Sequence, residues 1–75
     1  MIFEKIQEQI ADQLGIDLDD IEMDSNLEDD IGAAAVDVIE LLMHVEEEFD
    51  ITIPEEEVGN FVTVGDIVEY IKQNQ

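Results

Sequence analysis

The sequence predicts an all-α fold, a four-helix bundle with three longer helices and one short one. Apolar residues recur three and four residues apart in three separate stretches, which gives each stretch one apolar face. Helix start and stop signals flank these stretches, and no stretch alternates apolar and polar residues between turns as a strand would. A chain of 75 residues suits one domain, 1–75, with a modest core.

The first predicted helix covers residues 2–14. Its apolar stripe consists of Ile2, Phe3, Ile6, Ile10 and Leu14. Gly15 is expected to end the helix, because glycine adopts the left-handed backbone conformation at a helix C-terminus without steric cost.

A long acidic connection, residues 16–30, follows the first helix. Fifteen residues without regular structure would be unusual in so small a domain, so its apolar residues are expected to fold it back onto the core. Ser25 and Glu28 have the spacing of a capping box, which predicts a single helical turn at 26–30. The apolar residues that would hold the connection are Ile16, Leu18, Ile21, Met23 and Leu27.

The same connection partly resembles a calcium loop. Asp17, Asp19 and Glu28 match the first, third and twelfth loop positions. However, Ile21 replaces a ligand, and Glu22 stands where the loop requires glycine. No dedicated metal site is therefore expected, and weak divalent binding by surface carboxylates stays open.

The second predicted helix covers residues 36–49 and follows a turn that begins at Gly32. Leu41, Leu42 and Val45 lie on its apolar face, together with Phe49. The opposite side mixes carboxylates with exposed apolar residues and could serve as a docking surface. Its members are Val36, Asp37, Glu40, Met43, Glu46 and Glu47.

The remaining helices are predicted from their start signals. Pro54 fits a first helical position, and Gly59 keeps that helix short. Thr63 and Asp66 form a capping box that opens the last helix, which is expected to fray at 73–75. The predicted core consists of Phe3, Ile6, Ile10, Leu14, Ile31, Leu41, Val45, Phe49, Ile53, Val58, Phe61, Val64, Ile67 and Ile71, with up-down packing of the helices.

The charge of the chain is strongly one-sided. The sequence holds 22 acidic residues against two basic ones, Lys5 and Lys72, and its formal net charge is −20 at pH 7. No nucleic acid and no membrane is expected as a partner, because nucleic acids and anionic lipids are bound through basic residues. Basic patches of proteins fit this charge better.

Other absences narrow the function. The sequence has no cysteine, no apolar run long enough for a membrane span, and no recognisable signal peptide. These features indicate the cytoplasm, or an organelle after removal of a transit peptide, and we expect a monomer. No nucleophile–base pair or phosphate-binding glycine loop is found, and His44 is the only histidine. The chain is therefore predicted not to be an enzyme.

The residues resemble the acyl carrier proteins, in particular those of fatty-acid synthesis. The resemblance covers nearly the whole chain, from the first helix ending in Leu14-Gly15 to TVGDIVEYI at residues 63–71. Its middle part comprises EDDIGA at 28–33 and VDVIELLMHVEEEFDITIPEEE at 36–57. It implies a small acidic four-helix bundle that carries acyl chains on a 4′-phosphopantetheine arm.

The resemblance also implies an attachment site that this chain has lost. In the family the arm is attached to the serine of a D-S-L triplet at the start of the second helix. The matching residues here are Ala34, Ala35 and Val36. A methyl group has no oxygen to attack coenzyme A, so the chain is expected not to be phosphopantetheinylated at Ala35, to hold no cofactor and to carry no acyl chain.

Two explanations of this triplet are open. Deliberate replacement would lock an ordinary carrier protein in its apo form, and the confinement of the change to three adjacent positions favours this explanation. The alternative is a natural carrier-like protein without the arm. Such a protein would act as an adaptor or regulatory subunit through protein binding only.

A docking function is what the resemblance implies for the remaining surface. Basic patches of fatty-acid-synthesis enzymes and of phosphopantetheinyl transferase would meet its carboxylates, each exposed ion pair contributing only ~0–1 kcal/mol. For each carboxylate, a merely solvated helix face is the competing interpretation. The residues expected to bind partners are Val36, Asp37, Glu40, Met43, Glu46, Glu47, Glu55 and Glu56.

Overall fold

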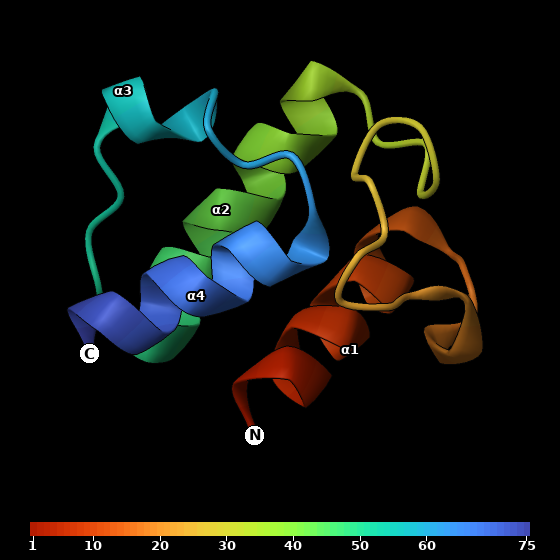
Figure 1. Cartoon of the computed structure of the whole chain (residues 1–75), viewed down its shortest axis with the longest axis horizontal. Coiled ribbons are helices and arrows are strands. Elements are labelled where there is room, and N and C mark those ends of the chain that lie inside the picture. The colour runs from red at the N-terminus through yellow and green to blue at the C-terminus, as the bar shows by residue number, and fades with distance from the viewer.

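The computed structural model describes residues 1–75 and confirms the all-α prediction. It contains the helices α1 (Ile2–Leu14), α2 (Ala35–Phe49), α3 (Glu55–Val58) and α4 (Val64–Asn74), and a 3-10 turn η1 (Leu18–Asp20) (Figure 1). Three helices are long and α3 is a single turn, as the sequence predicts. None of the helices is long and apolar enough to cross a membrane.

Helices α1 and α2 run in opposite directions. The Gln13 side-chain amide, near the end of α1, donates a hydrogen bond of 2.8 Å to the carbonyl of Asp37 at the start of α2. At the other end of the pair, Lys5 Nζ lies 3.7 Å from a carboxylate oxygen of Glu48. This pair fits the predicted up-down packing.

Helix α4 departs from that packing, because it runs in the same direction as α2 (Figure 1). Near the end of α4, the Tyr70 hydroxyl donates to the carbonyl of Thr52, just beyond the end of α2, at 3.4 Å. The connections around the short α3 return the chain to the starting end of α2 before α4 begins. The expectation of simple up-down packing is therefore wrong for α4.

The core lies among α1, α2 and α4, and it also includes the long connection. Ile21 and Leu27 are each only 1% exposed, so they hold the connection as predicted, whereas Leu18 and Met23 are exposed at 44% and 40%. Most of the predicted core is buried, but Phe3, Leu14, Phe49 and Val58 are only half-buried at its edge. Core residues missing from the predicted list are Ile21, Leu27, Ala33, Val38, Leu42 and Val68.

Backbone hydrogen bonds join the long connection to the start of α4. An isolated bridge pairs Asn26 with Thr63. The donors are the N–H groups of Leu27, Val64 and Gly65, and the acceptors are the carbonyls of Val62, Ser25 and Met23, at 2.9, 3.1 and 2.7 Å respectively. The connection thus satisfies backbone groups that would otherwise be unpaired at the first turn of α4.

The predicted turn after Ser25 forms, but its cap is Asn26. The Asn26 side-chain oxygen accepts the N–H groups of Glu28 and Asp29 at 3.0 and 2.9 Å. Ser25 is instead buried, and its hydroxyl accepts the N–H of Glu22 at 2.9 Å. The capping box predicted from Ser25 and Glu28 is therefore wrong by one residue.

The other helix ends lie within one or two residues of their predicted positions. Gly15 has the left-handed conformation at the end of α1 (φ 71°), and α2 begins one residue before the predicted start. Pro54 is the N-cap of α3 and not its first helical residue. The expected fraying at 73–75 is not found, because α4 continues to Asn74, whose side chain donates to the carbonyl of Tyr70 at 2.8 Å.

Candidate functional site

The start of α2 is built by a turn and a buried alanine. Gly32 has φ 83°, a conformation that glycine adopts without strain. Ala33 is buried, and its N–H donates to the carbonyl of Leu27 at 2.8 Å. Ala34 then has an extended conformation and is the N-cap, so Ala35 is the first helical residue.

Asp37 supplies the only side-chain cap at this helix start. Its carboxylate accepts the N–H of Ala34 at 3.0 Å. The reciprocal bond of a capping box, from the Asp37 N–H to the N-cap side chain, cannot form because alanine carries no acceptor. Asp37 therefore has a structural role, and it is only partly exposed.

Ala35 lies at the rim of a cleft between α2 and α3. The cleft has a volume of about 270 Å³, and apolar side chains make up most of its lining. Asn26, Glu28 and Asp29 contribute the polar part of its wall. The apolar lining consists of Ala35, Val38, Ile39, Val58, Phe61 and Val62.

The outer face of α2 combines exposed apolar residues with carboxylates. Val36 is 60% exposed and Met43 is 57% exposed, and both Glu40 and Glu47 are exposed on the same side of the helix. Ile39, at 48% exposure, lies between Val36 and Met43 at helical spacing. We call Val36, Ile39, Glu40, Met43 and Glu47 the outer face of α2.

The sequence analysis missed Ile39 and Val62. Val62 is 52% exposed and lines the cleft together with Ile39. Ile39 lies three residues after Val36 and four before Met43, so the helical spacing that placed those two residues outside would also have identified it. No local pattern marks Val62, which precedes the cap of α4.

The other predicted docking residues are not all free. The Glu46 carboxylate accepts the N–H of Ile53 at 2.7 Å in a partly buried position, and so holds the connection after α2. Glu55 and Glu56 are exposed in the first turn of α3, where the positive end of the helix favours acidic residues. Of the six predicted carboxylates, four therefore make no hydrogen bond to the rest of the chain: Glu40, Glu47, Glu55 and Glu56. The two predicted apolar side chains, Val36 and Met43, are exposed.

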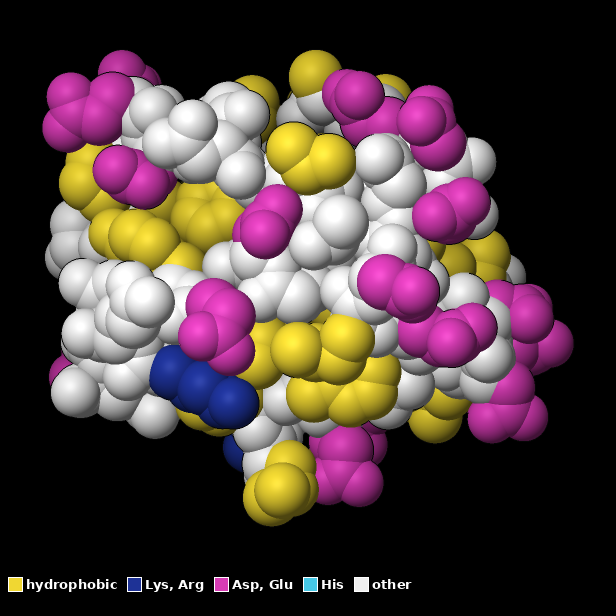
Figure 2. Space-filling view, in the orientation of Figure 1, with side chains coloured by type: hydrophobic (Ala, Val, Ile, Leu, Met, Phe, Trp, Pro, Cys, Tyr) yellow, Lys and Arg dark blue, Asp and Glu magenta, His cyan; other side chains and the backbone are white.

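Acidic side chains dominate the surface. Figure 2 shows them spread over the visible face between apolar patches, whereas the dark-blue basic side chains are confined to one side. Both lysines pair with glutamates, Lys5 with Glu48 at 3.7 Å and Lys72 with Glu69 at 3.8 Å. No group of three or more histidine or acidic side chains is placed to hold a metal ion.

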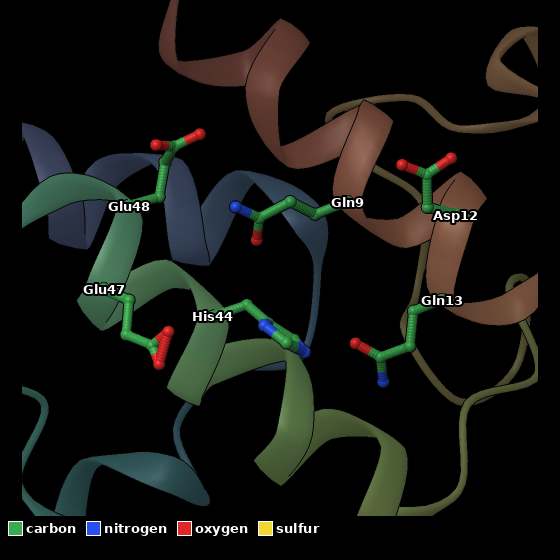
Figure 3. A pocket seen from close by; sticks show the side chains of 6 residues that line it. All are labelled: Gln9, Asp12, Gln13, His44, Glu47 and Glu48. Atoms are coloured by element: carbon green, nitrogen blue, oxygen red, sulfur yellow. The ribbon is translucent and has the colours of Figure 1, made fainter.

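His44 is exposed and lines an open hollow between α1 and α2. Side chains from both helices surround this hollow, and none of them is apolar (Figure 3). We call it the α1–α2 hollow; its lining consists of Gln9, Asp12, Gln13, His44, Glu47 and Glu48.

Comparison with known proteins identifies the family. Residues 4–71 match the family model described as "Phosphopantetheine attachment site". The chain is 54% identical over 72 residues to an acyl carrier protein of Clostridium acetobutylicum, covering 96% of this chain and 94% of that protein. It is 47% identical over 73 residues to one of Clostridium perfringens, covering 97% and 96%.

Solved structures agree with the sequence matches. The acyl carrier protein of Enterococcus faecalis superimposes with a TM-score of 0.83 at 30% identity, covering 99% of this chain and 94% of that one. An apo doublet acyl carrier protein from prodigiosin biosynthesis has the same fold, with a TM-score of 0.85 at 19% identity, covering 99% of this chain and 36% of that one. Acyl carrier proteins are carriers and not enzymes. With its fold and helix order shared with these proteins, and with 54% and 47% sequence identity to the two clostridial proteins, the chain belongs to the acyl carrier protein family.

Proposed function

We propose that this chain docks on enzymes of fatty-acid synthesis through the outer face of α2 but bears no phosphopantetheine arm. The observation that supports the proposal best is the contrast within one helix. Ala35, in the first turn of α2, offers only a methyl group, while the second and third turns of the helix present Glu40 and Met43 to solvent. We also propose that the chain acts in the cytoplasm, as expected from the sequence.

The chemistry at Ala35 supports the loss of the arm. Attachment requires a hydroxyl oxygen that attacks the phosphate of coenzyme A, and alanine has none. The only serine of the chain, Ser25, is 7% exposed, and its hydroxyl already accepts the N–H of Glu22. It is therefore a poor substitute, since the transferase would have to unfold the connection to reach it.

Electrostatics and apolar contact would act together in docking. The carboxylates of Glu40, Glu47 and Glu55 have no basic partner within the chain, so they are free to meet Lys and Arg on an enzyme. Exposed pairs are individually weak, but together they steer encounter and orientation and weaken with salt. Ile39 and Met43 would contribute the apolar centre of the contact.

An adaptor function is the second candidate. A natural carrier-like protein without the arm would retain the docking face and act only by binding, as a regulatory subunit. The intact helix α2, with its complete apolar core face and its acidic outer face, fits this candidate equally well. The restriction of the change to Ala34, Ala35 and Val36 favours deliberate replacement.

Intact mass tests the loss of the arm. The chain is incubated with coenzyme A and a phosphopantetheinyl transferase, beside the triple variant Ala34→Asp, Ala35→Ser, Val36→Leu. We expect the mass of the arm on the triple variant only. Addition of the arm to the parent chain at any side chain would disprove this part of the proposal.

Binding to a ketoacyl synthase tests the docking function. We expect affinity that falls with rising salt and falls again in the variants Glu40→Gln and Met43→Ala. Asp20→Asn, which removes a charge from the exposed turn η1, serves as the control and should change little. Tight binding to an unrelated complex, without binding to the synthase or the transferase, would favour the adaptor.

A further inference from the structure

The chain has three methionines, and the structure places them in three different settings. Met1 precedes α1 and is 88% exposed. Met23 lies in the long connection and is 40% exposed, and its carbonyl accepts the N–H of Gly65 at 2.7 Å. Met43 lies in the third turn of α2 and is 57% exposed. Met43 is therefore the methionine that belongs to the outer face of α2.

The neighbours of Met43 one helical turn away offer no hydrogen-bond donor. Ile39 and Glu40 lie one turn before it, and Glu46 and Glu47 lie one turn after it. The Ile39 side chain is apolar, and ionised carboxylates only accept hydrogen bonds. A polar oxygen on the Met43 side chain would therefore find its hydrogen bonds in water and not in the protein.

Oxidation of the thioether by a hydroperoxide places such an oxygen there. The Met43 sulfur attacks the terminal oxygen of the hydroperoxide, an S–O bond forms and the O–O bond breaks. The proton of that oxygen passes to the leaving alkoxide, which departs as an alcohol, or as water when the oxidant is hydrogen peroxide. Sulfur loses two electrons, the hydroperoxide gains them, and the product is a polar sulfoxide.

The position of Met43 decides what the sulfoxide changes. Met43 lies outside the core and does not pack against it, so the fold should be unaffected. In the free chain, water solvates the new oxygen. In a docked complex the oxygen would be withdrawn from water beside Ile39 and Glu40, where nothing donates to it. Because burial of a polar group without a hydrogen bond is unfavourable, the sulfoxide opposes docking.

We propose that Met43 is a reversible oxidation site whose conversion to the sulfoxide switches off docking through the outer face of α2. The thioether supplies the apolar centre of the contact, and the sulfoxide weakens binding by about tenfold, the scale of one unbonded polar group in an interface. Methionine sulfoxide reductases, which act on the two sulfoxide epimers, restore the apolar side chain. The switch rests on the proposed docking function and adds a means of regulating it.

Two matched variants separate Met43 from the other methionines. Met23→Leu leaves Met1 and Met43 to be oxidised, and Met43→Leu leaves Met1 and Met23. Each chain is treated with hydrogen peroxide, the peroxide is removed before any enzyme is added, and peptide mass mapping identifies the oxidised positions. Binding to a ketoacyl synthase is then measured for the oxidised and the unoxidised form of each chain, so a change in basal affinity caused by the substitution cancels in the comparison.

The switch predicts opposite results for the two variants. Oxidation of the Met23→Leu chain should weaken binding about tenfold and leave its melting temperature unchanged, since Met43 lies outside the core. Treatment with both classes of sulfoxide reductase should then restore the affinity. Oxidation of the Met43→Leu chain should leave its binding as it was before oxidation.

Several results would overturn the switch while leaving docking intact. They are unchanged binding by a Met23→Leu chain that is oxidised at Met43, an equal loss of affinity in oxidised Met43→Leu, and a Met43 that stays unreacted when Met1 and Met23 are converted. A lower melting temperature of the oxidised Met23→Leu chain would instead make the effect one of unfolding. Absence of synthase binding by the unoxidised parent chain would reject the proposed docking function, and the switch with it.

Discussion

Helices α2 and α4 begin with the same acidic device, but only α4 has its complete form. In α4, the Thr63 hydroxyl accepts the N–H of Asp66 at 3.2 Å, and the Asp66 carboxylate accepts the N–H groups of Thr63 and Val62 at 3.0 and 2.9 Å. In α2, Asp37 accepts the N–H of Ala34 at 3.0 Å, and no bond is returned.

Helix α2 forms even though its capping box is incomplete. Helix α2 still begins at Ala35, because Asp37 satisfies one free N–H group and because Val38, Leu41 and Val45 bury the helix against the core. Alanine also has the highest intrinsic helix propensity. Helix α2 thus forms from Ala35 although its N-cap, Ala34, has no polar side chain.

Replacement of Gly65 should have the largest effect on the start of α4. A Cβ atom at this position would lie 2.9 Å from the carbonyl oxygen of Met23, a backbone atom that also accepts the Gly65 N–H. We expect Gly65→Ala to lower the free energy of unfolding by about 2 kcal/mol, because the connection must move. Thermal unfolding should show a melting temperature lower by roughly 10 °C.

Gly59→Ala is the control for this change. A Cβ atom at Gly59 would meet nothing within 4 Å, and its φ of −72° suits alanine. A Gly65→Ala chain as stable as Gly59→Ala would show that the connection does not hold the start of α4.

Removal of the two aspartates should have unequal effects. Asp66→Ala deprives two N–H groups of their acceptor, and Asp37→Ala deprives one. We expect losses of about 1–2 kcal/mol for Asp66→Ala and about half as much for Asp37→Ala, measured by urea denaturation. Both changes put alanine at the same helix position, so the gain in helix propensity cancels in the comparison; equal losses would contradict the difference between the two caps.

Restoration of a cap at α2 should stabilise the chain. Ala34→Ser supplies the hydroxyl that could accept the N–H of Asp37, which makes the start of α2 like that of α4. We expect a gain of about 1 kcal/mol in the free energy of unfolding. Ala35→Ser should give no such gain, because Ala35 is already helical. If only Ala35→Ser stabilised the chain, the N-cap of α2 would be Ala35 and not Ala34.

Low pH should destabilise the start of α4 by protonating Asp66. Of the four predicted changes in stability, this one is expected to be the smallest. Hydrogen bonds from the backbone N–H groups of Thr63 and Val62 hold the pKa of Asp66 below its ordinary value. Because the folded-state pKa is lower than the unfolded-state pKa, this stabilisation is full above the unfolded value and is lost as pH falls through the folded value. Asp66 is exposed, so solvent reduces the contribution.

The comparison with Asp66→Asn measures this contribution. Between about pH 5 and pH 3, the parent chain should lose more stability than the variant, whose amide does not titrate there. Parallel stability curves for the two chains over this range would show that Asp66 contributes nothing specific to the acid response.

Local signals predicted much of the fold. The spacing of Ile6 and Ile10, the glycine after α1, and the Thr63–Asp66 pair each act within one or two helical turns, and all three were confirmed. The cap at Asn26 was missed because Ser25 and Asn26 are both good capping residues, and the choice depends on which side chain the core buries. Sequence alone does not show that burial.

The exposure of the residues in the proposed docking surface could be predicted only in part. Helical spacing placed Val36, Glu40 and Met43 outside, and the structure agrees. It could not show that Glu46 would bond to the N–H of Ile53, since the two lie in different segments. The unpaired oxygens of Gln9 and Gln13 were equally beyond prediction, because they depend on how α1 crosses α2.

By itself, the sequence determined where the long helices lie, the strong negative charge, and the absence of a hydroxyl at Ala35. These properties follow from composition and from interactions between residues close together in the chain. Only the tertiary structure decided that α4 runs parallel to α2, which carboxylates accept hydrogen bonds and which do not, and that a hollow lined by polar side chains opens between α1 and α2. Those features arise from contacts between distant segments, whose geometry has no signature in local spacing.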